Sequence, residues 1–201
     1  MAKAKRAKPT FIEEARQRQI QEIARGIFAR VGFQQTSLAE IAKAADISKG
    51  VIIYHYGSKS ELGKAVLRDT LKNYGDFLGE QLEKHNSAKH RLLEVPSACA
   101  AYIEQNRNPF LLYIDVLGSF GDLEEKRAFM AQTNQVQRSF LIRLIEDCMQ
   151  EGYFPSSQSS SLADVVQASL DGLMGQYSVD PEATDLKACA KLLREFISSL
   201  M

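Results

Sequence analysis

Residues 32–62, GFQQTSLAEIAKAADISKGVIIYHYGSKSEL, decide the fold of this 201-residue chain. Small and apolar side chains recur there at helical spacing and predict a first short helix with one buried face: Leu38, Ile41, Ala42 and Ala45. Residues 44–48, Ala-Ala-Asp-Ile-Ser, then favour a tight turn. A second helix over residues 48–54 is too short to be stable alone, so neighbouring helices must hold it. Two such helices around a tight turn are typical of a helix-turn-helix.

Helical periodicity continues outward on both sides of this segment, and no alternating strand pattern accompanies it. The chain is therefore expected to be all-α, with about nine helices. Their expected ranges are 11–31, 38–45, 48–54, 59–84, 89–106, 109–119, 122–151, 161–177 and 182–199.

Local signals mark several of these boundaries. Gly32 is expected to end the first helix. Ser37 with Glu40 and Ser58 with Glu61 fit the capping box, in which a hydroxyl and a carboxylate satisfy the first amides of a helix. Asn108-Pro109 and Asp180-Pro181 each place a capping residue before a proline at the first helical position.

The formal net charge is +0, from 25 Lys and Arg against 25 Asp and Glu, but the charges are unevenly distributed. The first 60 residues hold 11 basic and five acidic side chains, a charge of +6, and the remainder therefore carries −6. Such asymmetry favours a nucleic-acid partner for the first part. Residues 1–9 form a basic arm, which is either a solvated tail or a segment that touches phosphates.

Several classes of protein are excluded by what the sequence lacks. Cys99, Cys148 and Cys189 are too far apart for a zinc pattern or a disulfide framework, and no cofactor or metal site is expected. No nucleophile-elbow, dinucleotide, Walker or zinc-protease motif is present, so we expect no catalytic residues and no enzyme. Without a signal peptide or an apolar run long enough to span a bilayer, the protein is expected to be cytoplasmic and to have no membrane partner.

The second short helix and its flanks are rich in hydrogen-bond donors, the groups that contact phosphates. The candidates are Thr36, Ser37, Ser48, Lys49, Tyr54, His55 and Lys59. Gly50 would let the backbone approach a base edge, and Val51 could contact a thymine methyl group. The alternative is that the tyrosines are core residues and the lysines a solvated face.

The pattern from Thr36 to Leu62, with Ile-Ser-Lys-Gly at 47–50, Tyr54-His55-Tyr56 and Ser58-Lys59, resembles the DNA-binding signature of TetR-family transcriptional regulators. The resemblance implies phosphate contacts from Thr36 or Ser37, Tyr54, His55 and Lys59, and base-facing positions at residues 48–51. It also implies buried roles for Ile47, Ile52 and Tyr56. Ile53 departs from the family pattern, which usually has a tyrosine on the DNA side there, and Asp46 replaces a glycine of the turn.

The resemblance further implies a DNA-binding domain at residues 1–57 and a helical effector-binding and dimerisation domain at residues 58–201. A small-molecule effector could contact aromatic and acidic side chains of the middle helices: Tyr74, Phe77, Tyr102, Phe110, Tyr113 and Asp115. Each of them could equally be a packing residue, and Asp115 could pair with Arg143.

The last two helices carry wide apolar stripes with small residues alongside, which favours a two-fold four-helix interface. The expected interface residues are Val166, Leu170, Leu173, Met174, Leu193, Phe196 and Ile197. The sequence thus predicts a homodimeric, ligand-responsive regulator, most often a repressor in related proteins, that binds a double-stranded DNA operator. The alternative is a helical interaction protein whose helix-turn-helix is purely structural.

Overall fold

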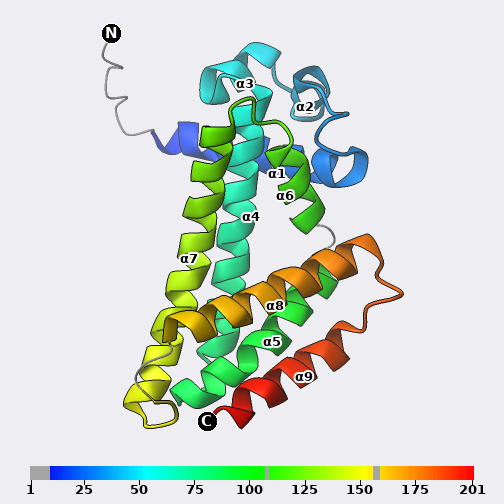
Figure 1. Cartoon of the computed structure of the whole chain (residues 1–201). Helices are drawn as coiled ribbons and strands as arrows, with labels where there is room; N and C mark the ends of the chain where they lie inside the picture. Colours follow the sequence, from blue (N-terminus) through cyan, green and yellow to red (C-terminus); the bar gives the residue numbers. More distant parts are fainter. Residues whose placement is uncertain (1–9, 107–108, 156–158) are drawn as a thin grey trace. The chain divides into compact units, whose positions relative to one another are not determined.

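The computed structural model describes residues 10–106, 109–155 and 159–201, and these residues confirm the all-α prediction. Nine helices and no strand are present among them (Figure 1). Their bounds are α1 Phe11–Val31, α2 Leu38–Ala44, α3 Lys49–Tyr56, α4 Lys59–Leu82, α5 Ala88–Gln105, α6 Pro109–Leu117, α7 Leu123–Gln150, α8 Ser159–Val179 and α9 Leu186–Ser199. The basic arm at residues 1–9 and the expected cap at Asn108 lie outside the described residues.

The chain divides into two compact units, and the first comprises Met1–Asp69 together with Leu112–Ser119. It differs from the expected domain limit at residue 57, because the first part of α4 and the last part of α6 join it. Helix α2 packs against both α1 and α3. The largest fully buried side chains of this unit are Ile20, Phe33, Ile41, Ile52, Leu62, Val66, Leu67 and Val116.

Local chemistry explains the helix-turn-helix. Ser37 accepts a hydrogen bond from the Glu40 amide, and the Glu40 carboxylate accepts from the Ser37 amide, so the expected capping box is formed. Asp46 in the turn has φ 52°, the left-handed conformation that Asp tolerates better than most residues. Ser48 occupies the N-cap position of α3, but its side chain makes no capping hydrogen bond.

The second unit, Thr70–Leu111 with Phe120–Met201, is built around α5. Helix α5 packs against α7, α8 and α9. The core is continuous from the end of α4 through α5 and α7 to α9. Its buried members include Leu82, Leu92, Ile145, Val166 and Ile197.

The expected start of the last helix at residue 182 is wrong, because α9 begins at Leu186. Asp185 is the N-cap and accepts from the Ala188 amide at 3.0 Å. Asp180 instead accepts from the amides of Glu182 and Ala183, so its side chain stabilises a turn rather than a helix start.

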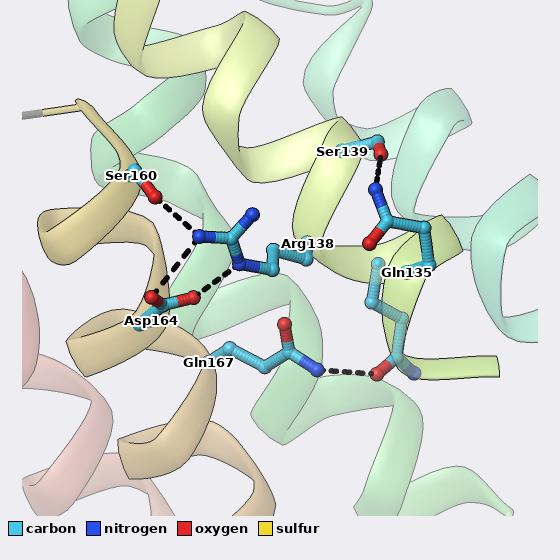
Figure 2. Close-up of polar contacts among 7 residues, drawn as sticks. Gln135, Arg138, Ser139, Ser160, Asp164 and Gln167 are labelled. Carbon is cyan, nitrogen blue, oxygen red and sulfur yellow. Dashed lines mark hydrogen bonds and ion pairs between the residues drawn. The ribbon is translucent and has the colours of Figure 1, made fainter. Parts of the chain in front are cut away.

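Helices α7 and α8 are joined by polar side chains as well as by packing (Figure 2). The Arg138 guanidinium of α7 donates to the Asp164 carboxylate of α8, with an Nε–Oδ1 distance of 2.5 Å, and also to the Ser160 hydroxyl. Further along the same helices, Gln167 donates to Gln137 across 3.2 Å. The side chains of Arg138 and Asp164 are 33% and 53% exposed, so solvent screens this ion pair and it adds little to the free energy of unfolding. Its main effect is to fix the orientation of α8 against α7.

The cysteines form no disulfide among the described residues. Cys99 and Cys148 are buried, which raises the pKa of Cys99 to about 12 and that of Cys148 to about 11. None of the described helices is long and apolar enough to cross a membrane.

Gly63 of α4 lets the ring of Phe33 lie directly against the helix backbone. A Cβ atom at position 63 would be 2.5 Å from Cε2 of Phe33, whose ring is held between Phe28 and Lys59. We expect Gly63→Ala to cost about 1–3 kcal/mol through overpacking, offset in part by the helical preference of alanine. Urea unfolding of the whole chain measures the change.

Gly26→Ala is the matched control, because Gly26 also lies in a helix of the first unit and a Cβ there would meet nothing within 4 Å. Alanine at position 26 should raise the free energy of unfolding by about 0.5–1 kcal/mol. Equal effects of the two substitutions would refute the close contact between Gly63 and Phe33.

Candidate nucleic-acid interface

Helix α3 presents one side to the core and the other to solvent. Ile52 is fully buried beneath it, whereas Ser48, Lys49, Gly50, Ile53 and Tyr54 are exposed and Val51 is partly exposed. The exposed set contains a hydroxyl, an ammonium and a phenol group, together with a glycine that offers bare backbone. This surface can donate to phosphates and reach base edges, as a recognition helix requires.

Tyr54 and His55 follow on the same helix, with their rings 5.1 Å apart in an edge-to-face arrangement. The Tyr54 hydroxyl donates to Oε1 of Glu13 in α1 at 3.2 Å. The backbone amide of Thr10 is the main cause of a lowered pKa at Glu13, so this carboxylate stays ionised at neutral pH. A phosphate contact by the Tyr54 hydroxyl would replace a carboxylate acceptor with a phosphate acceptor.

The structure corrects the expectation for Thr36. Its side chain is buried, and its hydroxyl donates to the carbonyl of Gly32 at 2.8 Å, so it does not reach the surface. Ser37 is exposed at the N-cap of α2, where its hydroxyl oxygen accepts from the Glu40 amide and its own proton remains available for a phosphate. Of the two alternatives, Ser37 is therefore the candidate.

Lys59 has a structural role that the sequence pattern did not indicate. Its ammonium group donates to the Gln34 carbonyl at 3.0 Å and lies 4.7 Å from the centroid of the Phe33 ring. Partial burial lowers the pKa of Lys59, and the nearby Glu40 carboxylate opposes that shift. Lys59 thus ties the start of α4 to the loop between α1 and α2.

Tyr56 anchors α3 to α1 from the inner side. Its hydroxyl donates to the Gln17 carbonyl at 2.9 Å, and burial raises its pKa to about 12. Ile47 is partly exposed, in contrast to the fully buried Ile52. Together Tyr56 and Ile52 fix which side of α3 faces outward.

Asp115 of α6 was an effector-binding candidate on the sequence, with Arg143 as its alternative partner. In the structure it belongs to the first unit, and its Oδ2 accepts from the Phe33 amide at 3.1 Å. The Gln34 side chain donates to the Asp115 carbonyl at 3.3 Å. The carboxylate therefore satisfies the loop that follows α1, which removes the reason to assign it to an effector.

Three of the other effector candidates come together in the second unit. The ring of Tyr102 lies 5.0 Å from that of Tyr74 and 5.4 Å from that of Phe77. Phe110 lies against α8, since a Cβ atom at Gly175 would be 3.1 Å from its ring. Tyr113, like Asp115, is in the first unit, so the expected effector set is divided between the two units.

The expected dimer residues separate into an inner and an outer group. Val166, Leu193 and Ile197 lie in the protomer's own core, so their assignment to an interface is corrected. Leu170, Leu173 and Met174 are partly buried against the core clusters, and Phe196 is 46% exposed. Other exposed apolar residues of this region are Val165 and Val179 of α8, Leu192 of α9 and Leu200, the residue that caps the end of α9.

Among the described residues, no group of three or more His, Cys, Asp or Glu side chains could hold a metal ion.

Ile53 is the residue of α3 whose contribution was underestimated: it is 45% exposed, so an apolar side chain accompanies Lys49 and Tyr54 on the outer side of the helix. A β-branched chain at that position can contact a thymine methyl group.

The Asp115 interaction can be tested by removing its acceptor. Asp115→Ala leaves the amide of the buried residue Phe33 without its partner, which should cost about 1.5–3 kcal/mol for a hydrogen bond to a charged group. Asp115→Asn keeps an oxygen acceptor and should cost less. Urea unfolding and hydrogen exchange at the Phe33 amide measure both effects. An unchanged exchange rate in Asp115→Ala would contradict the assignment.

Comparison with known proteins agrees with this geometry. Residues 20–66 match the family described as bacterial regulatory proteins, tetR family. The HTH-type transcriptional regulator AcrR of Shigella flexneri is 24% identical, over 94% of this chain and 88% of the relative.

Solved structures share the whole fold. A protein from Pseudomonas aeruginosa PAO1 aligns with a TM-score of 0.78 at 20% identity, over 93% of this chain and 90% of that one. The transcriptional regulator FadR from Bacillus subtilis, solved in complex with stearoyl-CoA, aligns with a TM-score of 0.76 at 18% identity, over 92% and 98% of the two chains. With its helix-turn-helix, its all-helical fold and the match at residues 20–66, this chain belongs to the TetR family of transcriptional regulators.

Proposed function

We propose that the protein is a homodimeric transcriptional regulator that binds a double-stranded DNA operator through α3 and is released by a small-molecule effector. The observation that carries the proposal is the outer side of α3, where Lys49, Ile53 and Tyr54 are exposed on a segment with a formal charge of +6. The family match at residues 20–66 supports the same assignment.

Exposure and chemistry indicate which residues of α3 and its flanks would contact bases and which would contact phosphates. Ser48, Lys49, Gly50 and Val51 begin the helix, where side chains of a recognition helix reach base edges. Ser37, Tyr54 and His55 supply donors on either side for phosphates. Lys59 already bonds the Gln34 carbonyl through one of its protons, and its remaining two protons could still meet a phosphate.

An effector would bind in the second unit, among the aromatic side chains of α4, α5 and α6. Tyr74, Phe77 and Tyr102 form one ring cluster, and Phe110 packs on α8. The similarly folded FadR was solved in complex with stearoyl-CoA, which supports a ligand site in this fold. Release requires that the effector bind more tightly to the conformation that does not bind DNA.

Helices α4 and α6 contribute residues to both units and are the routes by which an effector could alter the first unit. In α6, Phe110 contacts Gly175 within the second unit, and Asp115, five positions later, holds the Phe33 amide within the first.

The outward residues of α8 and α9 support a two-fold interface between protomers. Leu192 is 64% exposed and Phe196 is 46% exposed, although both alternate along α9 with core residues such as Leu193. A second copy would cover these side chains, as an exposed apolar face requires. Two reading helices would then meet two half-sites one helical turn or a multiple apart.

The contribution of Lys49 to sequence-specific binding can be measured with DNA fragments that the purified protein selects from the genome. Lys49→Ala should weaken binding to the selected duplex about 5- to 150-fold and leave binding to a scrambled duplex nearly unchanged, because base contacts carry specificity. Fluorescence anisotropy at fixed salt measures both. Lys84→Ala, which removes the same charge from an exposed site after α4, is the control.

Two results would count against this assignment. An equal loss on both duplexes would make Lys49 a phosphate contact. The absence of salt-dependent DNA binding by the unaltered protein would reject the regulator and favour the alternative, a helical interaction protein with a structural helix-turn-helix.

The dimer is tested by placing charges on the outer side of α9. Leu192→Asp with Phe196→Asp buries four unpaired charges in a two-fold interface, and even one such charge costs about 3–5 kcal/mol, which is roughly two to four orders of magnitude in affinity. Analytical ultracentrifugation should show monomers. Leu123→Asp, which alters a leucine that is 58% exposed at the start of α7, should remain dimeric. Dimers of the double variant would place the interface elsewhere.

A further inference from the structure

Asp171 of α8 is a carboxylate in an unusual environment in the second unit. It is partly buried, and among the described residues no Lys, Arg or His forms an ion pair with it. Burial raises the pKa of Asp171, and the side chain of Gln167 opposes the shift through a hydrogen bond. A carboxylate that is partly removed from water gains from a cationic partner, and the described residues supply none to Asp171.

Helix α8 packs against α5, which shares with α4 a cluster of aromatic side chains. Burial raises the pKa of Tyr74 and of Cys99, and the negative charge of Asp171 raises both further, so its carboxylate lies within electrostatic range of both. The Tyr74 hydroxyl is 2.8 Å from Sγ of Cys99, and its ring is 5.0 Å from that of Tyr102. Phe77 adds a third ring, 5.4 Å from Tyr102.

A fourth ring, that of Phe110 in α6, packs against α8 one turn beyond Asp171. Gly175 follows Asp171 by four positions, so the two residues share a side of the helix. Phe110 fills the space where a Cβ atom of residue 175 would be, at 3.1 Å from its ring. Asp171 and the ring of Phe110 therefore lie on the same side of α8.

We propose that these five residues, Asp171, Tyr74, Phe77, Tyr102 and Phe110, bind an organic cation such as a quaternary ammonium ion or a protonated amine. The carboxylate supplies the opposite charge, and ring faces attract a cation through their quadrupole. A desolvated carboxylate gains more from an incoming cation than an exposed one does. A metal ion is the weaker occupant, because a single carboxylate offers too few oxygen ligands.

The proposal rests on the proposed function, since it names the chemical class of the effector. It also provides a connection to α7. The amide of Gln167, which stabilises the Asp171 charge, donates to Gln137 of α7 across 3.2 Å (Figure 2). A cation that pairs with Asp171 would compete with the hydrogen bond from the Gln167 side chain to that carboxylate. The hydrogen bond between Gln167 and Gln137, and with it the contact between α7 and α8, would then change.

The test compares ligands of equal shape and different charge on the full chain. Isothermal titration calorimetry measures binding of (3-hydroxyphenyl)trimethylammonium and of its neutral isostere 3-tert-butylphenol, and the series from tetramethyl- to tetrabutylammonium covers the range of sizes. Asp171→Asn removes the charge at constant volume, and Asp171→Glu keeps it. Glu146→Gln, at an exposed position of α7, is the charge-matched control. Urea unfolding verifies that each variant is folded.

We expect a cation to bind at least about 30-fold more weakly to Asp171→Asn than to the unaltered chain, as for a charge pair in a desolvated site, and Asp171→Glu to retain most of the affinity. Glu146→Gln should bind normally. Equal binding of the neutral isostere, equal binding to Asp171→Asn, or no binding of any cation overturns the inference. DNA binding, measured separately and without ligand, tests the proposed function. The cation proposal and the proposed function can therefore fail independently.

Discussion

The first unit depends on the hydrogen bond from the Phe33 amide to the Asp115 carboxylate. Phe33 begins the loop between α1 and α2, and its buried amide has no helix to satisfy it. A carboxylate 82 residues away in the sequence does so. Lys59 fixes the same loop through the Gln34 carbonyl, so the start of α4 and the end of α6 both hold the segment that orients α2, and through it α3. The position of α3 thus depends on residues outside the helix-turn-helix.

A single central helix organises the second unit. Its helices surround α5, and α8 and α9 each bury one side and expose another apolar side. The buried side makes the protomer core, and the exposed side is the one that we propose a second copy covers. The −6 charge after residue 60 fits this arrangement, since a negative body would be repelled by phosphates while the +6 segment is attracted.

The sequence predicted what local chemistry determines. The capping box of Ser37 and Glu40, the tight turn around Asp46 and the stop at Gly32 depend on residues within a few positions, and all three are present. Roles set by distant partners were not predictable. Thr36 and Ser37 are both hydroxyl residues, and only the fold decides which one is buried. Likewise Leu192 and Leu193 are neighbours in one apolar stripe, yet only Leu193 faces the core. Successive residues of a helix point about 100° apart, and the fold decides which of the two directions is buried. Asp115 required knowledge of the loop it satisfies.

We propose that α2 and α3 form the DNA-binding surface, on a unit whose geometry is set by the start of α4 and the end of α6. Hydrogen-exchange mass spectrometry of the full chain, with and without a duplex selected from genomic fragments, tests this proposal. We expect DNA to slow exchange in peptides covering residues 37–56 and to leave peptides of α9 unaffected. Protection confined to α8 and α9, or none at residues 37–56 under conditions where the duplex is bound, would contradict it.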